Sequence, residues 1–453
     1  MGSWTLHVKD FGKIKEANVA VAPLTFFVGD NNSGKSYLMT LIYGLLHVEF
    51  FFQGYQFDET SAAYQRCSRV THAIMEDAEI EEAGYHTLEP DEICSFESLL
   101  NEVLQLNRDK FLQDLFNHKM QIGDISITFS RQIDYELEYR LTYEEQEMQI
   151  MLCGMDRNEN ALSGYIGTVA VNEKTSTTRF FISYILQYML RYRFEKKGFT
   201  ETAYLPITRT GFLLTYKMLA EDAMRDKFNI TNTRKNLLTK PNSDFLRTLS
   251  RMSSMENGNA FVDLAAFIEH QMIHGHITMP DMPTQDIQYT PESGDRPLPL
   301  HVTSGVVTEV TPLLLFLQHI NLGTLLIEEP EISLHPQLQW VMARTLIRLM
   351  NAGVSVIATT HSDLILQHVN NMLKLAKRAD RLTCAKRLGY QETDLLHKEA
   401  VAVYQFDVQP DNKTMVTELS CGDYGFEAMT FYHTLKAMNE QINTIEGDLD
   451  AES

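Results

Sequence analysis

The chain has 453 residues, of which 44% are hydrophobic and 22% charged, and its formal net charge is −21. This length suits about two or three domains, or one large domain with insertions. The negative charge argues against a protein that coats nucleic acid through its overall field, although a local basic groove stays compatible with it. The five cysteines form no C-x-x-C pair, which argues against a disulfide framework or a zinc site. No signal-peptide core and no apolar run of about 18 residues occurs, so we expect a soluble, cytoplasmic protein without a membrane partner.

Residues 4–28 alternate between apolar and polar positions and predict strands that lead to the first strong motif, Gly29-Asp30-Asn31-Asn32-Ser33-Gly34-Lys35-Ser36. This motif fits the phosphate-loop pattern G-x-x-x-x-G-K-S/T between a predicted buried strand and a predicted buried helix at 37–46. The backbone N–H groups of such a loop face phosphates, while Lys35 can reach the β- and γ-phosphates and Ser36 can bind Mg²⁺. We therefore predict that ATP is bound by Gly29, Asn31, Asn32, Ser33, Gly34, Lys35 and Ser36.

The next part of the chain changes its periodicity twice. Residues 58–118 carry apolar side chains at helical spacing, without the sustained heptads of a long coiled coil. Residues 122–153 alternate with period two, which predicts an antiparallel meander with one face in solvent, and a helix follows at 179–195.

Residues 203–211 predict a short strand and a turn, followed by a helix to about residue 227. A polar connection at 228–245, a helix at 246–274 and a hairpin at 287–302 come next. Arg209 could face nucleotide, a partner or DNA, and an ordinary surface position is an equally good interpretation. His270, His274 and His276 could bind a metal, but a polar helix end is the favoured interpretation.

The C-terminal part alternates between helices and strands. An apolar helix at 305–319 precedes a strand at 324–328, a helix at 336–351 and a buried strand at 354–361, which together predict a parallel, doubly wound sheet. A hairpin at 400–417, a last helix and an acidic tail at 446–452 complete the chain. Glu328 and Glu329 end the first of these strands, where Glu328 can bind Mg²⁺ and Glu329 can polarise a water molecule at the γ-phosphate. His361 ends the second strand and can contact the γ-phosphate.

These motifs resemble those of ABC-type ATPases. The eight-residue loop, residues 325–331, residues 333–336 and residues 359–362 are similar to the phosphate loop, Walker B motif, D-loop and H-loop of that class. Within it, the chain most resembles the prokaryotic group shared by OLD-type nucleases and related defence ATPases. Ser304-Gly305 stands where the signature motif belongs, although only half of L-S-G-G-Q is present. Glu328 stands where aspartate is usual, which we expect to alter magnesium geometry and slow turnover.

The resemblance implies a function and partners. ATP and Mg²⁺ would be the cofactors, and a head-to-tail homodimer would place Ser304 and Gly305 of one subunit on the nucleotide of the other. The residues after His361 show no strand-terminal glutamate followed by D-x-D, so we expect an ATPase that is not itself a nuclease. It looks like the ATPase subunits of two-gene anti-phage systems such as PARIS and Septu, which implies a separate Toprim or HNH nuclease effector and a phage-encoded trigger. A RecF-like or SMC-type DNA-repair ATPase is the main alternative, so DNA binding stays open, and a transporter ATPase or a nuclease in its own right is less favoured.

The expected fold is α/β, an ABC-type P-loop NTPase head with a mixed N-terminal sheet, a parallel sheet and a largely helical insertion. The expected segments are 1–57 and 286–398 for the two halves of the head, 58–121 for a helical insertion, 122–200 for the meander and its helix, 201–285 for a second helical insertion or arm, and 399–453 for the C-terminal hairpin, helix and tail.

Overall fold

The structure is a computed structural model, and it describes residues 4–47, 54–144, 147–156, 160–161, 167–170, 174–191, 201–227, 238–252, 260–279, 286–294, 296–428 and 438–445. The predicted acidic tail and residues 228–237 of the predicted polar connection lie outside this range. Within it, no helix combines the length and the apolar character that crossing a membrane requires.

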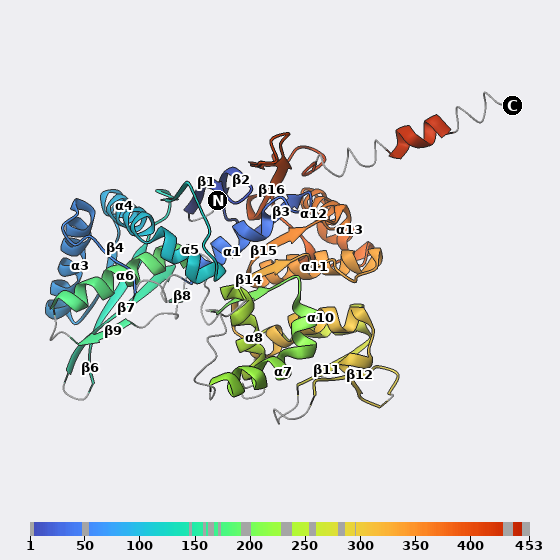
Figure 1. Ribbon diagram of the computed structural model, residues 1–453, viewed down its shortest axis with the longest axis horizontal. Helices are drawn as coiled ribbons and strands as arrows, with labels where there is room; N and C mark the ends of the chain where they lie inside the picture. The colour runs from blue at the N-terminus through green and yellow to red at the C-terminus, as the bar shows by residue number, and fades with distance from the viewer. Residues whose placement is uncertain are drawn as a thin grey trace.

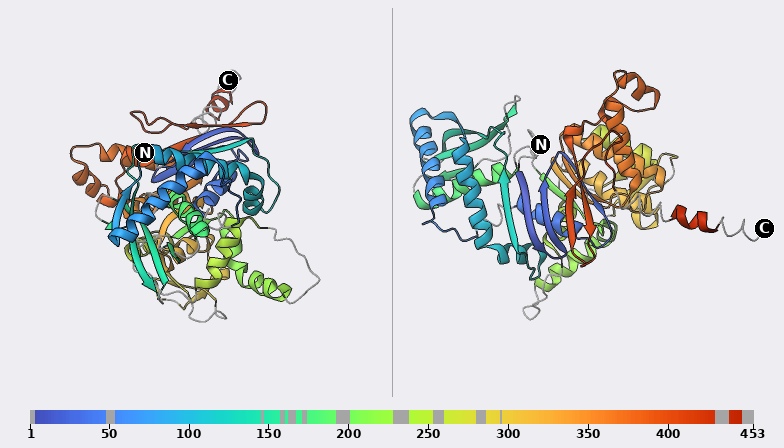
Figure 2. Two further views of the ribbon diagram at one scale, coloured as in Figure 1. Left: turned by 90° about the vertical axis from the view of Figure 1, so that its left-hand side faces the viewer. Right: turned by 90° about the horizontal axis from the view of Figure 1, so that it is seen from above.

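A nine-stranded sheet forms the centre of the molecule (Figures 1 and 2). Its spatial order is β10-β14-β15-β3-β16-β17-β2-β1-β5. In chain order the strands are β1 (Trp4–Phe11), β2 (Ile14–Ala20), β3 (Leu24–Gly29), β5 (Asp124–Phe129), β10 (Glu201–Leu205), β14 (Leu322–Glu328), β15 (Ser355–Thr360), β16 (Val401–Val408) and β17 (Thr414–Glu418). The first five strands in space run parallel, and antiparallel pairs dominate the rest. Every residue of β3, β14 and β15 is buried, which explains their continuous apolar sequences.

The predicted α/β fold is confirmed, and strands from three of the predicted segments join the central sheet. The strand expected in the meander, β5, pairs with β1 of the central sheet. The strand expected in the second insertion, β10, pairs with β14 as an edge of the same sheet. The C-terminal hairpin of β16 and β17 lies in the middle of the sheet, where β16 pairs with β3. Alternation of apolar residues identifies a strand but does not identify its partner, because pairing depends on contacts between distant segments.

A largely helical lobe occupies one end of the molecule, and its helix α4 contacts β5 (Figure 1). It contains α3 (Ala62–Glu81), α4 (Pro90–Leu106), α5 (Arg108–Phe116) and α6 (Lys174–Arg191). A second, antiparallel sheet in this lobe comprises β4 (Ala83–Thr87), β6 (Glu136–Glu144), β7 (Glu147–Asp156), β8 (Asn160–Ala161) and β9 (Gly167–Ala170). The helices predicted for 58–118 are confirmed. The strand β4 between two of them was not predicted, and it forms because it pairs with β6 in the second sheet.

The remaining elements cover the parallel half of the sheet. They are α1 (Lys35–Leu46), α7 (Arg209–Lys227), α8 (Lys240–Met252), α9 (Val262–Ile268), the π-helix η1 (Glu269–Ile273), α10 (Gly305–His319), α11 (Pro336–Ala352), α12 (Asp363–Ala376), α13 (Arg381–Arg387) and the 3₁₀ turns η2 (Leu300–Val302), η3 (Glu392–Asp394) and η4 (Lys398–Ala400). A small sheet of β11 (Gly275–Thr278), β12 (Gln288–Pro291) and β13 (Leu298–Pro299) replaces the predicted two-stranded hairpin. The single helix expected at 246–274 is wrong, because α8 begins at Lys240 and α9 is a separate helix. A helix at 438–445 projects from the body (Figures 1 and 2).

The core lies on both faces of the sheet. Phe27 of β3 packs with α1 and the helical lobe, whereas its neighbours Phe26 and Val28 pack with α10, α11 and α12. Successive side chains of a strand point to opposite faces, so the strand before the phosphate loop is fixed from both sides.

Candidate nucleotide-binding site

Four adjacent parallel strands bring the predicted site residues together. β3, β15, β14 and β10 are neighbours in the sheet, so their carboxyl ends lie at one edge. The phosphate loop follows β3, His361 follows β15, Glu329 follows β14 and Pro206 follows β10. In open α/β sheets, ligands bind at this edge.

The two fixed glycines of the phosphate loop have backbone conformations that other residues rarely adopt. Gly29 has φ +131°, and a Cβ atom there would lie 2.5 Å from the carbonyl oxygen of Phe406. Gly34 has φ +97°, and its Cβ would lie 2.9 Å from Cγ1 of Ile14. The two fixed glycines of the motif are therefore required by β16 and β2 as well as by the loop itself.

Lys35 is buried and folded against its own loop. Its Nζ donates to the carbonyl oxygens of Gly29 at 3.0 Å and Asp30 at 2.6 Å, and to Oγ of Ser33 at 3.3 Å. Burial lowers the pKa of Lys35 to about 8, while the carboxylates of Glu329, Asp30 and Glu331 oppose this shift. The ammonium group thus lies at the centre of the loop, and the exposed Ser36 follows it at the N-terminus of α1.

The two acids after β14 have different surroundings. Glu328 is buried, and its Oε2 accepts the backbone N–H of Ile207 at 3.0 Å. Glu329 has φ +41°, and its backbone N–H donates to the carbonyl oxygen of Thr359 at 3.0 Å. Its Oε1 lies 3.4 Å from Nε2 of His361. The hydrogen bond with His361 lowers the pKa of Glu329, so this side chain stays ionised.

Glu331 belongs to the site although no role was predicted for it. Its Oε1 accepts the backbone N–H of His361 at 2.5 Å, and its buried Oε2 has no hydrogen-bond partner among the described residues. Burial raises the pKa of Glu331. A buried carboxyl oxygen without a partner, close to Lys35 and Glu329, fits a site completed by a cation or its water. Hydroxyl and carboxylate oxygens, such as those of Ser36, Glu328 and Glu331, are the kind of ligand that Mg²⁺ prefers.

The two residues that stand in the place of the signature motif, Ser304 and Gly305, lie at the start of α10. Oγ of Ser304 caps this helix by accepting the backbone N–H of Val307 at 3.5 Å, and both Ser304 and Gly305 are exposed. A Cβ on Gly305 would lie 3.8 Å from Cβ of Ser333, so this turn lies against the D-loop of the same chain. The free N-terminal N–H groups of a helix are suited to an anion.

The structure contradicts an ordinary surface position for Arg209. Its side chain is only 2% exposed, and Nη2 lies 2.5 Å from Oε1 of Glu309 on α10. Nη1 also donates to the carbonyl oxygen of Glu328 at 2.6 Å. Sequence reasoning missed this contact, although Glu309 is the only Asp, Glu, Lys or Arg between residues 305 and 319. A lone acid in an apolar helix needs a partner when it is buried, and that signal could have pointed to a cation.

Comparison with known families decides the class of the chain. Residues 4–366 match the model of a family described as an AAA ATPase domain. The chain belongs to this AAA ATPase domain family. No curated protein matches its sequence.

This AAA ATPase domain is also similar to solved SMC heads. An SMC head bound to the C-winged helix domain of ScpA is 14% identical, with a TM-score of 0.34, and the match covers 92% of this chain and 97% of the other. The SMC head domain from Thermotoga maritima is 12% identical, with a TM-score of 0.32 and coverage of 93% and 100%. The Pyrococcus furiosus SMC head with an extended coiled coil, bound to the C-terminal domain of ScpA, is 12% identical, with a TM-score of 0.34 and coverage of 96% and 98%.

The predicted histidine cluster forms pairs with carboxylates. Nδ1 of His270 lies 3.0 Å from Oε1 of Glu292, and Nδ1 of His276 lies 2.9 Å from Oε2 of Glu269. Among the described residues, no group of three or more His, Cys, Asp or Glu side chains could hold a metal ion. These contacts fit the favoured interpretation of a polar helix end.

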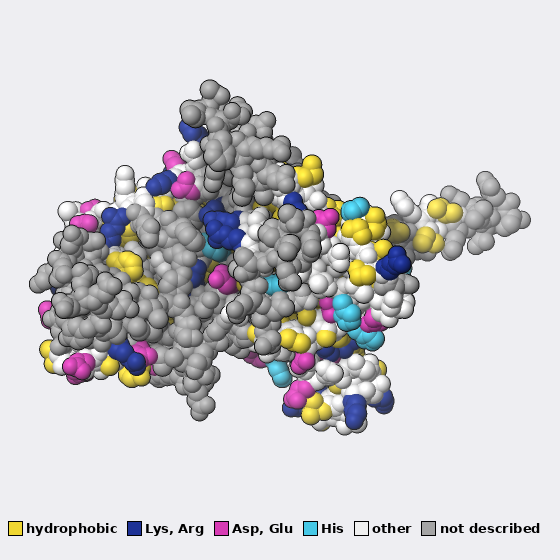
Figure 3. Space-filling view, turned by 90° about the horizontal axis from the view of Figure 1, so that it is seen from below, with side chains coloured by type: hydrophobic (Ala, Val, Ile, Leu, Met, Phe, Trp, Pro, Cys, Tyr) yellow, Lys and Arg dark blue, Asp and Glu magenta, His cyan; other side chains and the backbone are white. Residues whose placement is uncertain are grey.

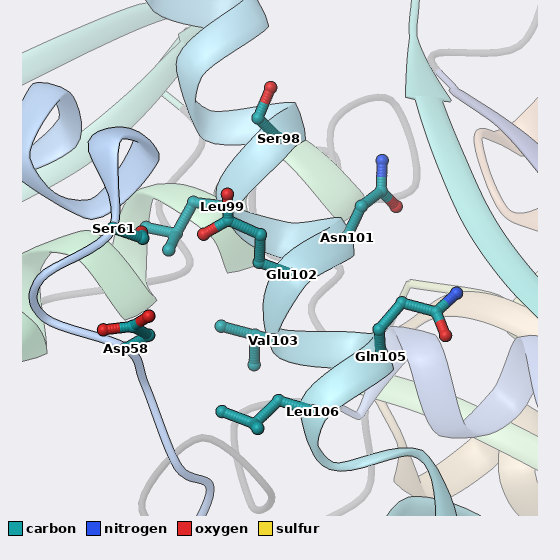
Figure 4. A pocket seen from close by; sticks show the side chains of 9 residues that line it. All are labelled: Asp58, Ser61, Ser98, Leu99, Asn101, Glu102, Val103, Gln105 and Leu106. Carbon is teal, nitrogen blue, oxygen red and sulfur yellow. The ribbon is translucent and has the colours of Figure 1, made fainter.

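A cavity of the AAA ATPase domain lies in the helical lobe, between α4 and the segment that precedes α3 (Figure 4). Asp58, Ser61, Glu102 and Gln105 are among its lining residues. None of its lining residues belongs to the phosphate loop or to the segments after β14 and β15, so this cavity is distinct from the nucleotide site.

Proposed function

We propose that this AAA ATPase domain binds ATP with Mg²⁺ and hydrolyses it slowly, as the ATP-sensing scaffold subunit of a prokaryotic anti-phage defence system that regulates a separate nuclease. The observation that carries the ATPase part is the convergence of Lys35, Glu328, Glu329 and His361 at one edge of the sheet. The defence part rests on the resemblance of the motifs to defence ATPases.

In this proposal the phosphate loop binds the triphosphate. The backbone N–H groups of residues 29–36 and the N-terminus of α1 face the phosphates, with the side chains of Asn31, Asn32 and Ser33 around them. Lys35 exchanges its contacts with the loop carbonyls for the β- and γ-phosphates. Ser36 and Glu328 hold Mg²⁺, which neutralises phosphate charge when it is bound.

Hydrolysis needs a group that orients and deprotonates water. Glu329 takes this role because its lowered pKa keeps it ionised and able to accept a proton. His361 fixes the Glu329 carboxylate through their 3.4 Å contact and is placed to sense the γ-phosphate. Glu328 is one methylene longer than the usual aspartate and is already engaged by the N–H of Ile207, and both features favour slow turnover.

The proposed assembly is a head-to-tail homodimer. The exposed Ser304 and Gly305 at the N-terminus of α10 can approach the nucleotide of a second subunit. ATP would join the two subunits and hydrolysis would release them, which gives the protein a nucleotide-dependent shape that a nuclease effector or a phage-encoded trigger can read.

A RecF-like or SMC-type ATPase acting on DNA is the second candidate. It requires a positively charged surface for phosphate contacts. On the face in Figure 3, the described Lys and Arg side chains are interspersed with Asp and Glu. Together with the net charge of −21, this mixture favours a protein partner over DNA.

The test is co-purification from the native operon, with and without ATP, using wild type and Lys35→Ala. We expect a nuclease to co-purify with wild type, and we expect Lys35→Ala to lose ATP and the ATP-dependent change in assembly. DNA binding with a steep salt dependence would support the second candidate. Metal-dependent DNA cleavage by the purified chain alone would contradict a scaffold role. In size-exclusion chromatography, an ATP-loaded Glu329→Gln variant that remains monomeric would contradict the dimer.

A further inference from the structure

We infer that Arg209 is a positioning residue that couples the start of α10 to the two acids after β14. In the proposed dimer each nucleotide lies between the phosphate loop of one subunit and Ser304 and Gly305 of the other. Through Arg209, nucleotide at one of these two shared sites sets the hydrolytic geometry of the other site. This inference rests on the proposed ATPase dimer. Its observation is independent of the phosphate loop, because it concerns a buried contact between α7, α10 and the end of β14.

The guanidinium of Arg209 binds both acids through their main chain. Nη1 donates to the carbonyl oxygen of Glu328 at 2.6 Å and Nη2 donates to that of Glu329 at 3.0 Å. Nη1 also reaches the carbonyl oxygen of Pro206 at 3.2 Å, which holds the arginine to its own turn. A planar group with five donors in a fixed fork can hold several acceptors in one arrangement, which an ammonium group cannot do.

The same guanidinium is tied to the signature helix. Oε1 of Glu309 lies 2.5 Å from Nη2 of Arg209, and the neighbouring Thr210 donates its hydroxyl to Oε2 of Glu309 at 2.5 Å. Glu309 lies about one helical turn after the cap residue Ser304. Both charged side chains are almost completely buried, so neither can separate from the other without leaving an unpaired charge.

The turn that carries Arg209 also holds the Glu328 side chain. The backbone N–H of Ile207, two residues before Arg209, donates to Oε2 of Glu328 at 3.0 Å. Glu329 has the uncommon φ of +41°, a conformation that persists only when its surroundings constrain it. Contacts to its carbonyl oxygen therefore help to set where its side chain meets His361.

A mechanical path follows from these contacts. A phosphate bound by the partner at Ser304 and Gly305 would move or fix the first turn of α10, and Glu309 would follow because it begins the next turn of the same helix. Arg209 would then shift or fix the carbonyl groups of Glu328 and Glu329. Because coupling between binding sites is reciprocal, Mg²⁺ and ATP at the acids would in turn bias the start of α10 toward the partner.

The test compares Arg209→Lys, Glu309→Gln and a matched control, Arg344→Lys. Lysine keeps the charge of Arg209 and removes the fork. Arg344 pairs with the buried Asp394 at 2.9 Å instead of with the acids after β14. Its variant therefore shows how much of any effect comes merely from replacing a paired arginine by lysine. The measurements are ATP affinity, kcat, the Mg²⁺ concentration for half-maximal activity, the Hill coefficient for ATP and the thermal midpoint.

We expect Arg209→Lys and Glu309→Gln to bind ATP with an affinity within about twofold of wild type, whereas their kcat should be about 10- to 100-fold lower. Both variants should need more Mg²⁺ for half-maximal activity. Their Hill coefficient for ATP should fall to about 1, whereas that of wild type should lie above about 1. Arg344→Lys should have a thermal midpoint similar to that of Arg209→Lys, but it should keep the wild-type kcat and Hill coefficient. Wild-type kcat and cooperativity in both Arg209→Lys and Glu309→Gln would overturn the coupling and leave the ATPase proposal intact. A wild-type dimer that hydrolyses ATP without cooperativity would likewise overturn the coupling and leave the ATPase proposal intact. If wild type binds no ATP, the proposed function fails together with the inference.

Discussion

The lysine of the phosphate loop makes ATP affinity depend on pH in an unusual range. In the free protein, burial lowers the pKa of Lys35 to about 8 from its ordinary value of 10.5. The ammonium form is therefore lost as the pH rises through about 8, well before an exposed lysine would lose it. Bound phosphates favour the charged form and raise the pKa again, so ATP binding above about pH 8 must take up a proton.

The size of the effect follows from the shifted pKa. At about pH 9, roughly one tenth of the free protein carries the charged lysine, so the apparent Kd for ATP should be about tenfold higher than at about pH 7. This change corresponds to about 1.4 kcal/mol of binding free energy. At about pH 9, close to one proton should be taken up for each ATP bound.

Isothermal titration calorimetry in two buffers of different ionisation enthalpy measures both quantities. Lys35→Arg keeps its charge at these pH values, so its affinity, although lower, should lose most of this pH dependence. Burial also lowers the pKa of Lys240 of α8 to about 8, but Lys240 lies outside the phosphate loop. Lys240→Arg should therefore show the same pH dependence of the Kd for ATP as wild type. A Kd that stays constant within about twofold between about pH 7.5 and 9.5, without proton uptake, would refute the reasoning.

Two pairs of substitutions test the packing of the phosphate loop and the role of burial in an ion pair elsewhere in the fold. Gly29→Ala should lower the free energy of unfolding by about 2–4 kcal/mol, because the added Cβ would lie 2.5 Å from the Phe406 carbonyl oxygen at a positive φ. Gly211→Ala, at a helical position with open space, should instead raise it by about 0.5–1 kcal/mol, and a similar urea midpoint for the two variants would contradict the conformational argument. Asp394→Asn should lower the free energy of unfolding by about 3 kcal/mol, because its buried carboxylate pairs with two arginines. Asp380→Asn removes one partner of an exposed pair and should leave the urea midpoint unchanged, so equal effects of the two aspartate variants would argue against burial as the cause.

Much of the site could be predicted because its chemistry is local in the chain. The fixed residues of the phosphate loop lie within eight consecutive positions, and their spacing alone specifies the turn and the helix start. The buried strands β14 and β15 were evident as continuous apolar runs, and each ends at the polar residues predicted to act. Since parallel strands end at one edge of a sheet, the pattern predicted that Glu329 and His361 lie at the same edge, and the structure adds the contact between them.

Tertiary structure decided everything that depends on which segments meet. The places of β5, β10 and β16 in one sheet follow from pairing between distant segments, and an alternating or apolar run is compatible with several partners. The pairing of Arg209 with Glu309 was hidden for the same reason, because the sequence shows a charged residue in each segment but not the burial that forces them together. A residue's charge is a property of the sequence, whereas the removal of that charge from water is a property of the packed fold, and here that removal determines the partner of Arg209.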